Sequence, residues 1–344
     1  MRASVKPFPG RAGTPLLAAL AALAALGTPA CATGEIAPVA TPPAAVAPNV
    51  PRSAPDDTDL LGVIPDGAET VIAVDVVQVR ASPWSRALVS LPDAERTART
   101  DGQGFDEVVD VDRAVFAVSE GAGEPTTLVV AQGRFDQARL TQALGGGWTR
   151  GDWRGSRVWQ RGDQARALLT ARTLITGQRD AVRTAIDCAW SLTPDVRQGP
   201  LGGLLREQSA AGGGSRAAVT AASTVTEAMR RRVEGQFALP AGLQRAAGRL
   251  DLGPSLELEL VGVLDSERQA GETAHNLNVT LRDLRARRAL AIFGITPFLD
   301  GVTIAAQGQR AQVRLVVPEN RREDLAAKVA FVLEAIRARG ASQQ

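Results

Sequence analysis

Pairs of strand-like segments separated by short turns constrain the fold of this chain more than any other feature of the sequence. Each segment is rich in Val, Leu, Ile or Ala, and two of the turns contain both Gly and Pro. Strands joined so closely pair antiparallel, because a parallel pair needs a crossover of about a dozen residues or more. The predicted hairpins join Asp112–Glu120 to Thr126–Phe135, Leu243–Leu252 to Ser255–Leu264, and Asp300–Gln309 to Ala311–Pro318.

Helical segments alternate with these hairpins, which predicts an α+β fold. We expect two tandem, structurally similar units, 57–195 and 215–344, separated by a Gly-rich connection at 196–214. In each unit the helices are expected to pack on one face of an antiparallel sheet. The other predicted strands are Glu69–Val77, Ser156–Asp163, Ala165–Gly177 and Ser215–Ser223, and the predicted helices are Ser82–Leu91, Phe135–Leu144, Gln178–Trp190, Leu201–Gln208, Thr224–Phe237, Ser266–Arg288 and Asn320–Ala338.

Local patterns support several of these elements. Ser266 with Gln269 has the spacing of a helix capping box. The last predicted helix carries an apolar stripe that begins at Leu325, and such stripes are expected to lie on the sheet. In LELEL, strict alternation places Glu257 and Glu259 together on the exposed face of a half-buried strand.

The first 30 residues have the pattern of a secretory signal peptide. Arg2, Lys6 and Arg11 precede an apolar core at Pro15–Leu26. That core is shorter than the ~20 residues that a membrane-spanning helix needs. The segment 1–30 is therefore predicted to direct export and to be removed.

Cys31 follows this leader and is the predicted attachment site of a lipid. Thr28–Cys31, TPAC, is similar to a bacterial lipobox, although Thr28 stands where the usual lipobox has Leu. The alternative is ordinary cleavage after Ala32, in the pattern Ala-Cys-Ala. A lipid on Cys31 would anchor the exported chain in the cell envelope, facing the periplasm or the cell surface.

Residues 31–56 are rich in Pro and Ala and predict a disordered, extended tether. Removal of the leader also changes the net charge from +2 to −1, since it takes away three basic residues and no acidic residue. The mature chain therefore offers no electrostatic argument for nucleic-acid binding.

The stretch Ile64–Trp84, IPDGAETVIAVDVVQVRASPW, follows this leader and tether. With them, it resembles uncharacterised exported, lipid-anchored envelope proteins of GC-rich bacteria. The resemblance implies export and α+β units, and it implies no catalytic residue, cofactor or activity.

The residues that most often carry catalysis are scarce. No nucleophile elbow, phosphate-binding loop or dinucleotide fingerprint occurs in the sequence. The single histidine, His275, is predicted to face solvent, and Cys188 is predicted to be a small buried residue at a helix end. We expect no catalytic, metal or cofactor site.

Two groups of carboxylates need an explanation. Asp56, Asp57 and Asp59 cluster where the tether meets the folded body, and solvated charge is favoured over a weak calcium site. Asp75 interrupts an apolar strand. Because a buried carboxylate needs a partner, we expect it to pair with an arginine or to cap a turn.

The segment Gly147–Gly162 combines tryptophan with arginine and is the candidate binding surface. A two-residue turn at Gly155-Ser156 would place Arg154 opposite Arg157 and Arg150 opposite Arg161. These facing arginines would repel each other unless an anionic or sugar partner offsets the charge. The alternative is that the arginines cover the tryptophans or pair with acids. The predicted face contains Trp148, Arg150, Asp152, Arg154, Arg157, Trp159 and Arg161.

Three functions fit these features. The first is a non-enzymatic cell-envelope lipoprotein that binds or scaffolds an envelope protein or glycan. The second is a periplasmic carrier of an apolar ligand, which requires a large internal apolar cavity. The third is a carboxylate-based hydrolase such as a glycosidase, which requires two acids within ~5–10 Å in a cleft.

Overall fold

The computed structural model describes most of the chain after residue 58. The predicted signal segment, the predicted tether and Cys31 lie outside the described residues, as does most of the last predicted helix. The described residues are 59–85, 103–120, 125–145, 147–211, 217–233, 239–288, 290 and 294–328.

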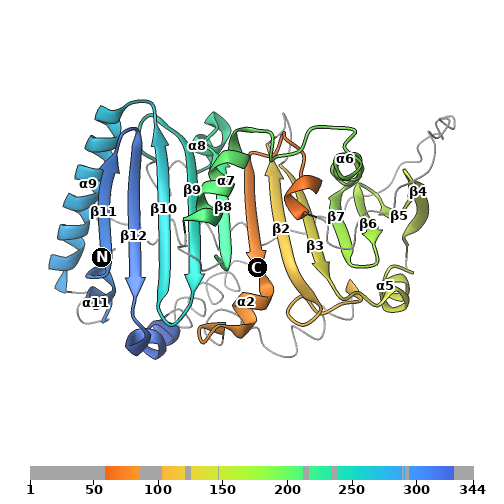
Figure 1. Cartoon of the computed structure of the whole chain (residues 1–344), viewed down its shortest axis with the longest axis horizontal. Helices are drawn as coiled ribbons and strands as arrows, with labels where there is room; N and C mark the ends of the chain where they lie inside the picture. The colour runs from red at the N-terminus through yellow and green to blue at the C-terminus, as the bar shows by residue number, and fades with distance from the viewer. Residues whose placement is uncertain are drawn as a thin grey trace, which may run out of the picture.

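The described strands form a 12-stranded sheet in the order β11-β12-β10-β9-β8-β1-β2-β3-β7-β6-β5-β4 (Figure 1). All neighbouring strands in this order pair antiparallel. The predicted α+β class is therefore confirmed. The strands are β1 (Thr70–Asp75), β2 (Val111–Ser119), β3 (Thr126–Gly133), β4 (Thr149–Trp153), β5 (Ser156–Arg161), β6 (Gln164–Thr170), β7 (Thr173–Gln178), β8 (Val219–Thr224), β9 (Leu243–Leu252), β10 (Leu256–Leu264), β11 (Val302–Gln307) and β12 (Arg310–Val317).

The two halves of the chain meet inside this sheet, where β1 pairs with β8. A side-chain hydrogen bond of 2.7 Å between Thr70 Oγ1 and Ser223 Oγ joins the two strands. The order β1-β2-β3-β7-β6 on one side of this seam matches β8-β9-β10-β12-β11 on the other. The halves thus share one continuous sheet in place of the two sheets expected. That each half is a unit by itself stays a prediction.

The largest hydrophobic cluster lies on the face covered by η1 (Leu60–Val63), α6 (Arg179–Ala189) and α7 (Pro200–Ala210), here called the α7 face. Val71 of β1 packs in this cluster with Ile186 of α6 and Leu205 of α7. Ala247 and Val263, from β9 and β10, belong to the same cluster. Both halves of the chain therefore contribute to one core.

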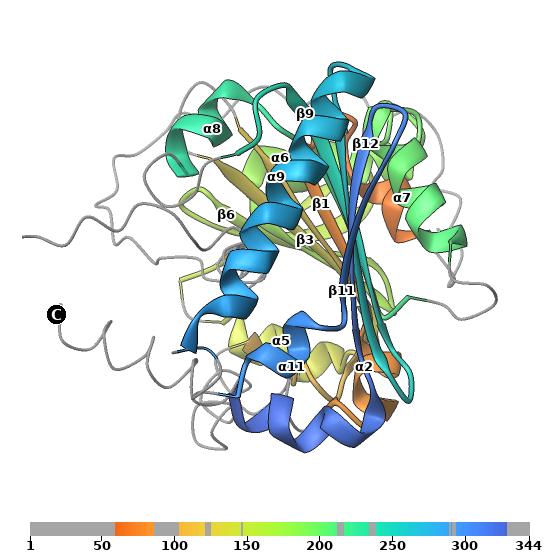
Figure 2. The same cartoon turned by 90° about the vertical axis from the view of Figure 1, so that its left-hand side faces the viewer.

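The opposite face, here called the α9 face, has its own helices (Figure 2). Leu140 of α5 (Gln137–Ala143) packs with Leu174 of β7. At the other end of the sheet, Leu281 of α9 (Glu267–Ala286) packs with Val302 of β11 and with Leu299 of α11 (Thr296–Leu299). The helix α8 (Glu227–Val233) lies on the same side as α9. The expectation that helices cover one face is wrong, because both faces of the sheet carry apolar side chains.

The helix ends follow their local signals. The Ser266 Oγ atom accepts a hydrogen bond of 3.3 Å from the backbone N–H of Gln269, so the predicted cap of α9 is confirmed. After η2 (Glu319–Arg321), residues 322–328 are helical, and Leu325 packs against the cluster around Trp84. The rest of the predicted apolar stripe lies outside the described residues.

A helix begins where the sequence predicts the last residues of a strand. The structure has α2 at Val76–Ala81, and Asp75 Oδ1 accepts a hydrogen bond of 3.0 Å from Gln78 N at its start. Asp75 therefore caps a helix, where a turn cap or an arginine partner was expected. Ser82 is extended (φ −67°, ψ 141°), the conformation that the following Pro83 favours. Most of the predicted helix Ser82–Leu91 lies outside the described residues.

The predicted connection 196–214 belongs to the folded body over most of its length. Its short predicted helix is α7, which covers β8 and β9 and buries Leu201, Leu204 and Leu205. Asp195, just before it, is 4% exposed, and the hydrogen bonds from Arg197 hold the pKa of its carboxyl below the usual range. In the described part of the chain no helix is long and apolar enough to span a membrane.

Candidate functional site

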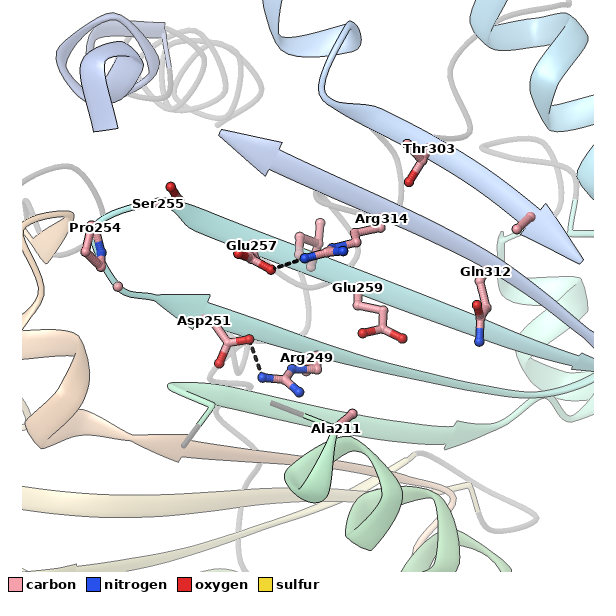
Figure 3. A pocket seen from close by; sticks show the side chains of 13 residues that line it. Ala211, Arg249, Asp251, Pro254, Ser255, Glu257, Glu259, Thr303, Gln312 and Arg314 are labelled. Atoms are coloured by element: carbon pink, nitrogen blue, oxygen red, sulfur yellow. Dashed lines mark hydrogen bonds and ion pairs between the residues drawn. The ribbon is translucent and has the colours of Figure 1, made fainter. Parts of the chain in front are cut away.

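An open groove of about 710 Å³ lies on the α7 face beyond the end of α7 (Figure 3). Its floor is formed by β9, β10, β12 and β11. Ala211, which follows α7, and the β9–β10 turn at Gly253–Ser255 line its sides. The groove thus exposes a part of the sheet that belongs entirely to the second half of the chain.

The register of three strands places charged side chains of alternating sign across the floor. Arg249 of β9 lies opposite Glu259 of β10, and Glu259 lies opposite Arg314 of β12. One row away, Asp251 lies opposite Glu257. Because side chains two residues apart on a strand share a face, all five belong to the α7 face. Cross-strand pairing therefore assembles a charged surface from residues that are scattered in the sequence.

Two ion pairs hold this surface together. Arg314 Nη2 lies 2.6 Å from Glu257 Oε2, and Arg249 Nη2 donates to Asp251 Oδ2. The hydrogen bond from Arg314 to Glu257, followed by the charge of that carboxylate, raises the pKa of Arg314. Arg249 is 5% exposed, whereas Arg314 is more than half exposed. The Arg249–Asp251 pair is thus built into the floor, and the Arg314–Glu257 pair is accessible to a ligand.

Glu259 lies between the two arginines (Figure 3). The two arginines donate side-chain hydrogen bonds to other carboxylates, Arg249 to Asp251 and Arg314 to Glu257. Among the described residues, Asp251 Oδ1 is buried and accepts no hydrogen bond. The groove therefore offers carboxylate acceptors at Glu257 and Glu259, guanidinium donors at Arg314, and the amide of Gln312.

Sequence reasoning found only part of this groove. It placed Glu257 and Glu259 on one exposed face, which the structure confirms. It missed Arg249, Asp251 and Arg314. The predicted two-residue turn at Gly253-Pro254 would set Asp251 opposite Leu256, whereas the observed turn is one residue longer and sets Asp251 opposite Glu257. Arg314 required the β10–β12 pairing, which the hairpin turns do not specify.

The predicted pairing within the Trp–Arg hairpin is wrong. Its turn is Arg154-Gly155, both with positive φ (52° and 78°), and Trp153 pairs with Ser156. Asp152 therefore faces Arg157, and Arg150 faces Trp159. The facing arginine pairs do not form, so the repulsion argument for a partner no longer holds.

Two residues of the predicted face have structural roles. Trp159 is 4% exposed and packs in the cluster under α5. Arg154 lies in the turn, and its Nε donates to Asp187 Oδ1 at 3.0 Å. Trp153 Nε1 donates to the same oxygen at 3.1 Å. The other five residues lie on one face: Trp148, Arg150, Asp152, Arg157 and Arg161.

The other chemistry-bearing residues lie apart from the groove. His275 is exposed on α9, and Cys188 is buried near the end of α6, as predicted for both. Burial raises the pKa of the Cys188 thiol, which disfavours the reactive thiolate. Asp59 caps η1 and pairs with Arg197, while Asp56 and Asp57 lie outside the described residues. In the described ranges no group of three acidic, cysteine or histidine side chains is placed to hold a metal ion.

Comparisons with known proteins found structures of similar fold but did not identify a family for this chain. No protein-family model matches the sequence, and no curated protein matches it. The chain is similar to TP0453 in crystal forms III, I and IV, with 12%, 12% and 11% identity and TM-scores of 0.49, 0.46 and 0.47. The matches cover 79%, 79% and 78% of this chain and 99%, 98% and 95% of TP0453. They concern the path of the chain and say nothing about a ligand.

Proposed function

We propose that this chain is an exported, lipid-anchored, non-enzymatic binding protein of the cell envelope, and that its groove binds a glycan. The observation that carries the proposal is the charged floor, where Arg249, Glu259 and Arg314 alternate in one row. The leader and Cys31 supply the location, and the tether would let the body reach several tens of ångström from a membrane.

The lining of the groove favours a glycan over a protein partner. Protein interfaces draw most of their binding energy from aromatic, aliphatic or arginine anchors in apolar pockets. The described lining of the groove includes Glu257, Glu259, Gln312, Arg314 and other polar side chains, and no aromatic residue is among the lining residues that the structure describes. Planar carboxylate, amide and guanidinium groups each offer two hydrogen-bonding positions, which suits neighbouring sugar hydroxyls.

A glycosidase is the second candidate, because the groove contains facing carboxylates. Asp251 and Glu257 are directly opposite in the register, which places their Cβ atoms about 5 Å apart. Both carboxylates already form ion pairs within the protein, Asp251 with Arg249 and Glu257 with Arg314. Because both are engaged with the protein's own arginines, we favour binding without turnover.

The apolar-carrier alternative requires an enclosed apolar cavity. The groove and a second pocket of about 400 Å³ near Arg230 and Asp265 are both lined in part by charged side chains. Neither has the lining that an apolar ligand requires.

Calorimetric titration of the full-length chain with an N-acetylglucosamine tetramer, as the glycan probe, tests the proposal. Arg314→Ala should weaken binding by about tenfold or more, the loss expected for one charge-assisted hydrogen bond. Arg310→Ala is the matched control, since Arg310 lies on the same strand but pairs with Glu207 of α7. It should change affinity less than about twofold.

Two results would contradict this function. Equal weakening by both substitutions, or no binding of the oligosaccharide, would remove the groove as a glycan site. Shorter products after long incubation, abolished by Glu257→Gln, would establish the hydrolase instead.

A further inference from the structure

A cluster of arginines lies at the other end of the sheet, on the α9 face. It consists of Arg150 of β4, Arg157 and Arg161 of β5, and Arg166 of β6, which we call the arginine cluster. Pairing in register places Arg150, Trp159 and Arg166 in one row across the three strands. Sequence reasoning did not include Arg166, because only the β5–β6 pairing brings it to this face.

Tryptophan rings hold these arginines in place. The Cζ atoms of Arg161 and Arg166 lie 5.0 and 5.4 Å from the ring centroid of Trp148. Arg157 lies 5.9 Å from the ring of Trp159, which is itself buried. These distances are in the range of cation–π contacts. The alternative that arginines cover the tryptophans is therefore confirmed, and two guanidinium groups converge on one indole.

The described residues provide no ion-pair partner for the arginines of the cluster. Among them, no carboxylate forms an ion pair with any of the four arginines; Arg166 donates to the backbone oxygen of Gln103 at 3.4 Å. Burial, and then the charge of Arg161, lower the pKa of Arg166, and the charge of Glu107 acts in the opposite direction. Asp152 is opposite Arg157 but exposed.

Arg154, in the same hairpin, behaves differently. It lies toward α6 and pairs with Asp187. Arginine stays protonated at neutral pH, so Arg161 and Arg166 repel each other across Trp148. An anion that contacts both guanidinium groups would relieve this repulsion.

We propose that the arginine cluster binds a phosphate group of a ligand, with Arg161 and Arg166 as the main contacts. A phosphate monoester carries close to two negative charges and three acceptor oxygens, so it can accept hydrogen bonds from two guanidinium groups together. A carboxylate carries one charge and would leave one arginine unneutralised. A phosphorylated sugar and the headgroup of phosphatidic acid are both phosphate monoesters and both offer this chemistry.

Calorimetric titration of the full-length chain with inorganic pyrophosphate tests the site, with sodium chloride at matched ionic strength as the blank. Arg161→Gln and Arg166→Gln should each weaken binding by about tenfold or more. Arg154→Gln, on the opposite face of the same hairpin, is the matched control and should leave affinity within about twofold. Circular dichroism of each variant confirms that it remains folded.

Competition experiments identify the source of the phosphate group. Displacement of pyrophosphate by glucose 6-phosphate, but not by phosphatidic acid vesicles, supports the site with a soluble ligand. Displacement by those vesicles, but not by phosphatidylcholine vesicles, supports it with an anionic headgroup. The proposal is overturned if pyrophosphate does not bind beyond the chloride blank, or if Arg154→Gln weakens binding as much as Arg161→Gln.

Discussion

At the scale of single residues, burial decides whether an aromatic side chain stabilises the fold or is available to a partner. Trp159 is 4% exposed and packs with Leu168 and Leu174 beneath α5. Trp159→Ala should therefore lower the free energy of unfolding by about 3–5 kcal/mol, as for other large buried side chains. Urea unfolding measures this loss.

Arg150→Ala is the control for this measurement, because Arg150 faces Trp159 from the neighbouring strand but is exposed. It should change stability by no more than about 0.5 kcal/mol. An unchanged unfolding midpoint in Trp159→Ala would show that the indole is not part of the core.

The turn of this hairpin shows why its pairing could not be predicted from the sequence. Trp153-Arg-Gly-Ser156 can form a two-residue turn at Arg154-Gly155 or at Gly155-Ser156. The first requires a positive φ at an arginine, which is uncommon for a residue other than glycine. The contact of Arg154 with Asp187, 33 residues away, favours it. A turn rule that considers only neighbouring residues cannot account for a contact with a residue so distant in the sequence.

At the scale of elements, α7 is attached to the sheet in two ways. Leu205 is buried against the α7 face, and Glu207 forms an ion pair with Arg310 of β12. Leu205→Ala should lower the free energy of unfolding by about 2–5 kcal/mol. Glu207→Ala should lower it by less than about 1 kcal/mol, since both partners of the ion pair are exposed.

Chemical denaturation of both α7 variants gives the comparison. A larger loss in Glu207→Ala than in Leu205→Ala would mean that charge, and not apolar packing, holds the helix that borders the groove.

Most elements were predictable because their signals are local. Hairpin turns and alternation located β2, β3, β9, β10, β11 and β12, and the Ser266 cap located α9. The α2 helix was not predicted, because the apolar run through Asp75 fits a longer strand equally well. The carboxylate of Asp75, which interrupts this apolar run, caps the first turn of α2.

At the scale of the whole molecule, the arrangement of the hairpins was not predictable. Pairing between β1 and β8 joins residues 153 apart, at Thr70 and Ser223, and no turn connects them. The groove required the same kind of information, since Arg314 and Glu257 meet through β10 and β12. The sequence thus predicts the parts of the sheet, while their order depends on contacts between distant segments.

The proposed function also depends on where the whole chain resides, because an envelope glycan is accessible only to an exported protein. Mass spectrometry of the native protein, purified from the membrane fraction, tests this requirement most directly. We predict a mature chain that begins at Cys31 and carries the mass of attached acyl groups. A native chain that retains Met1, or one that is recovered from the cytosol, would contradict export and the function that rests on it.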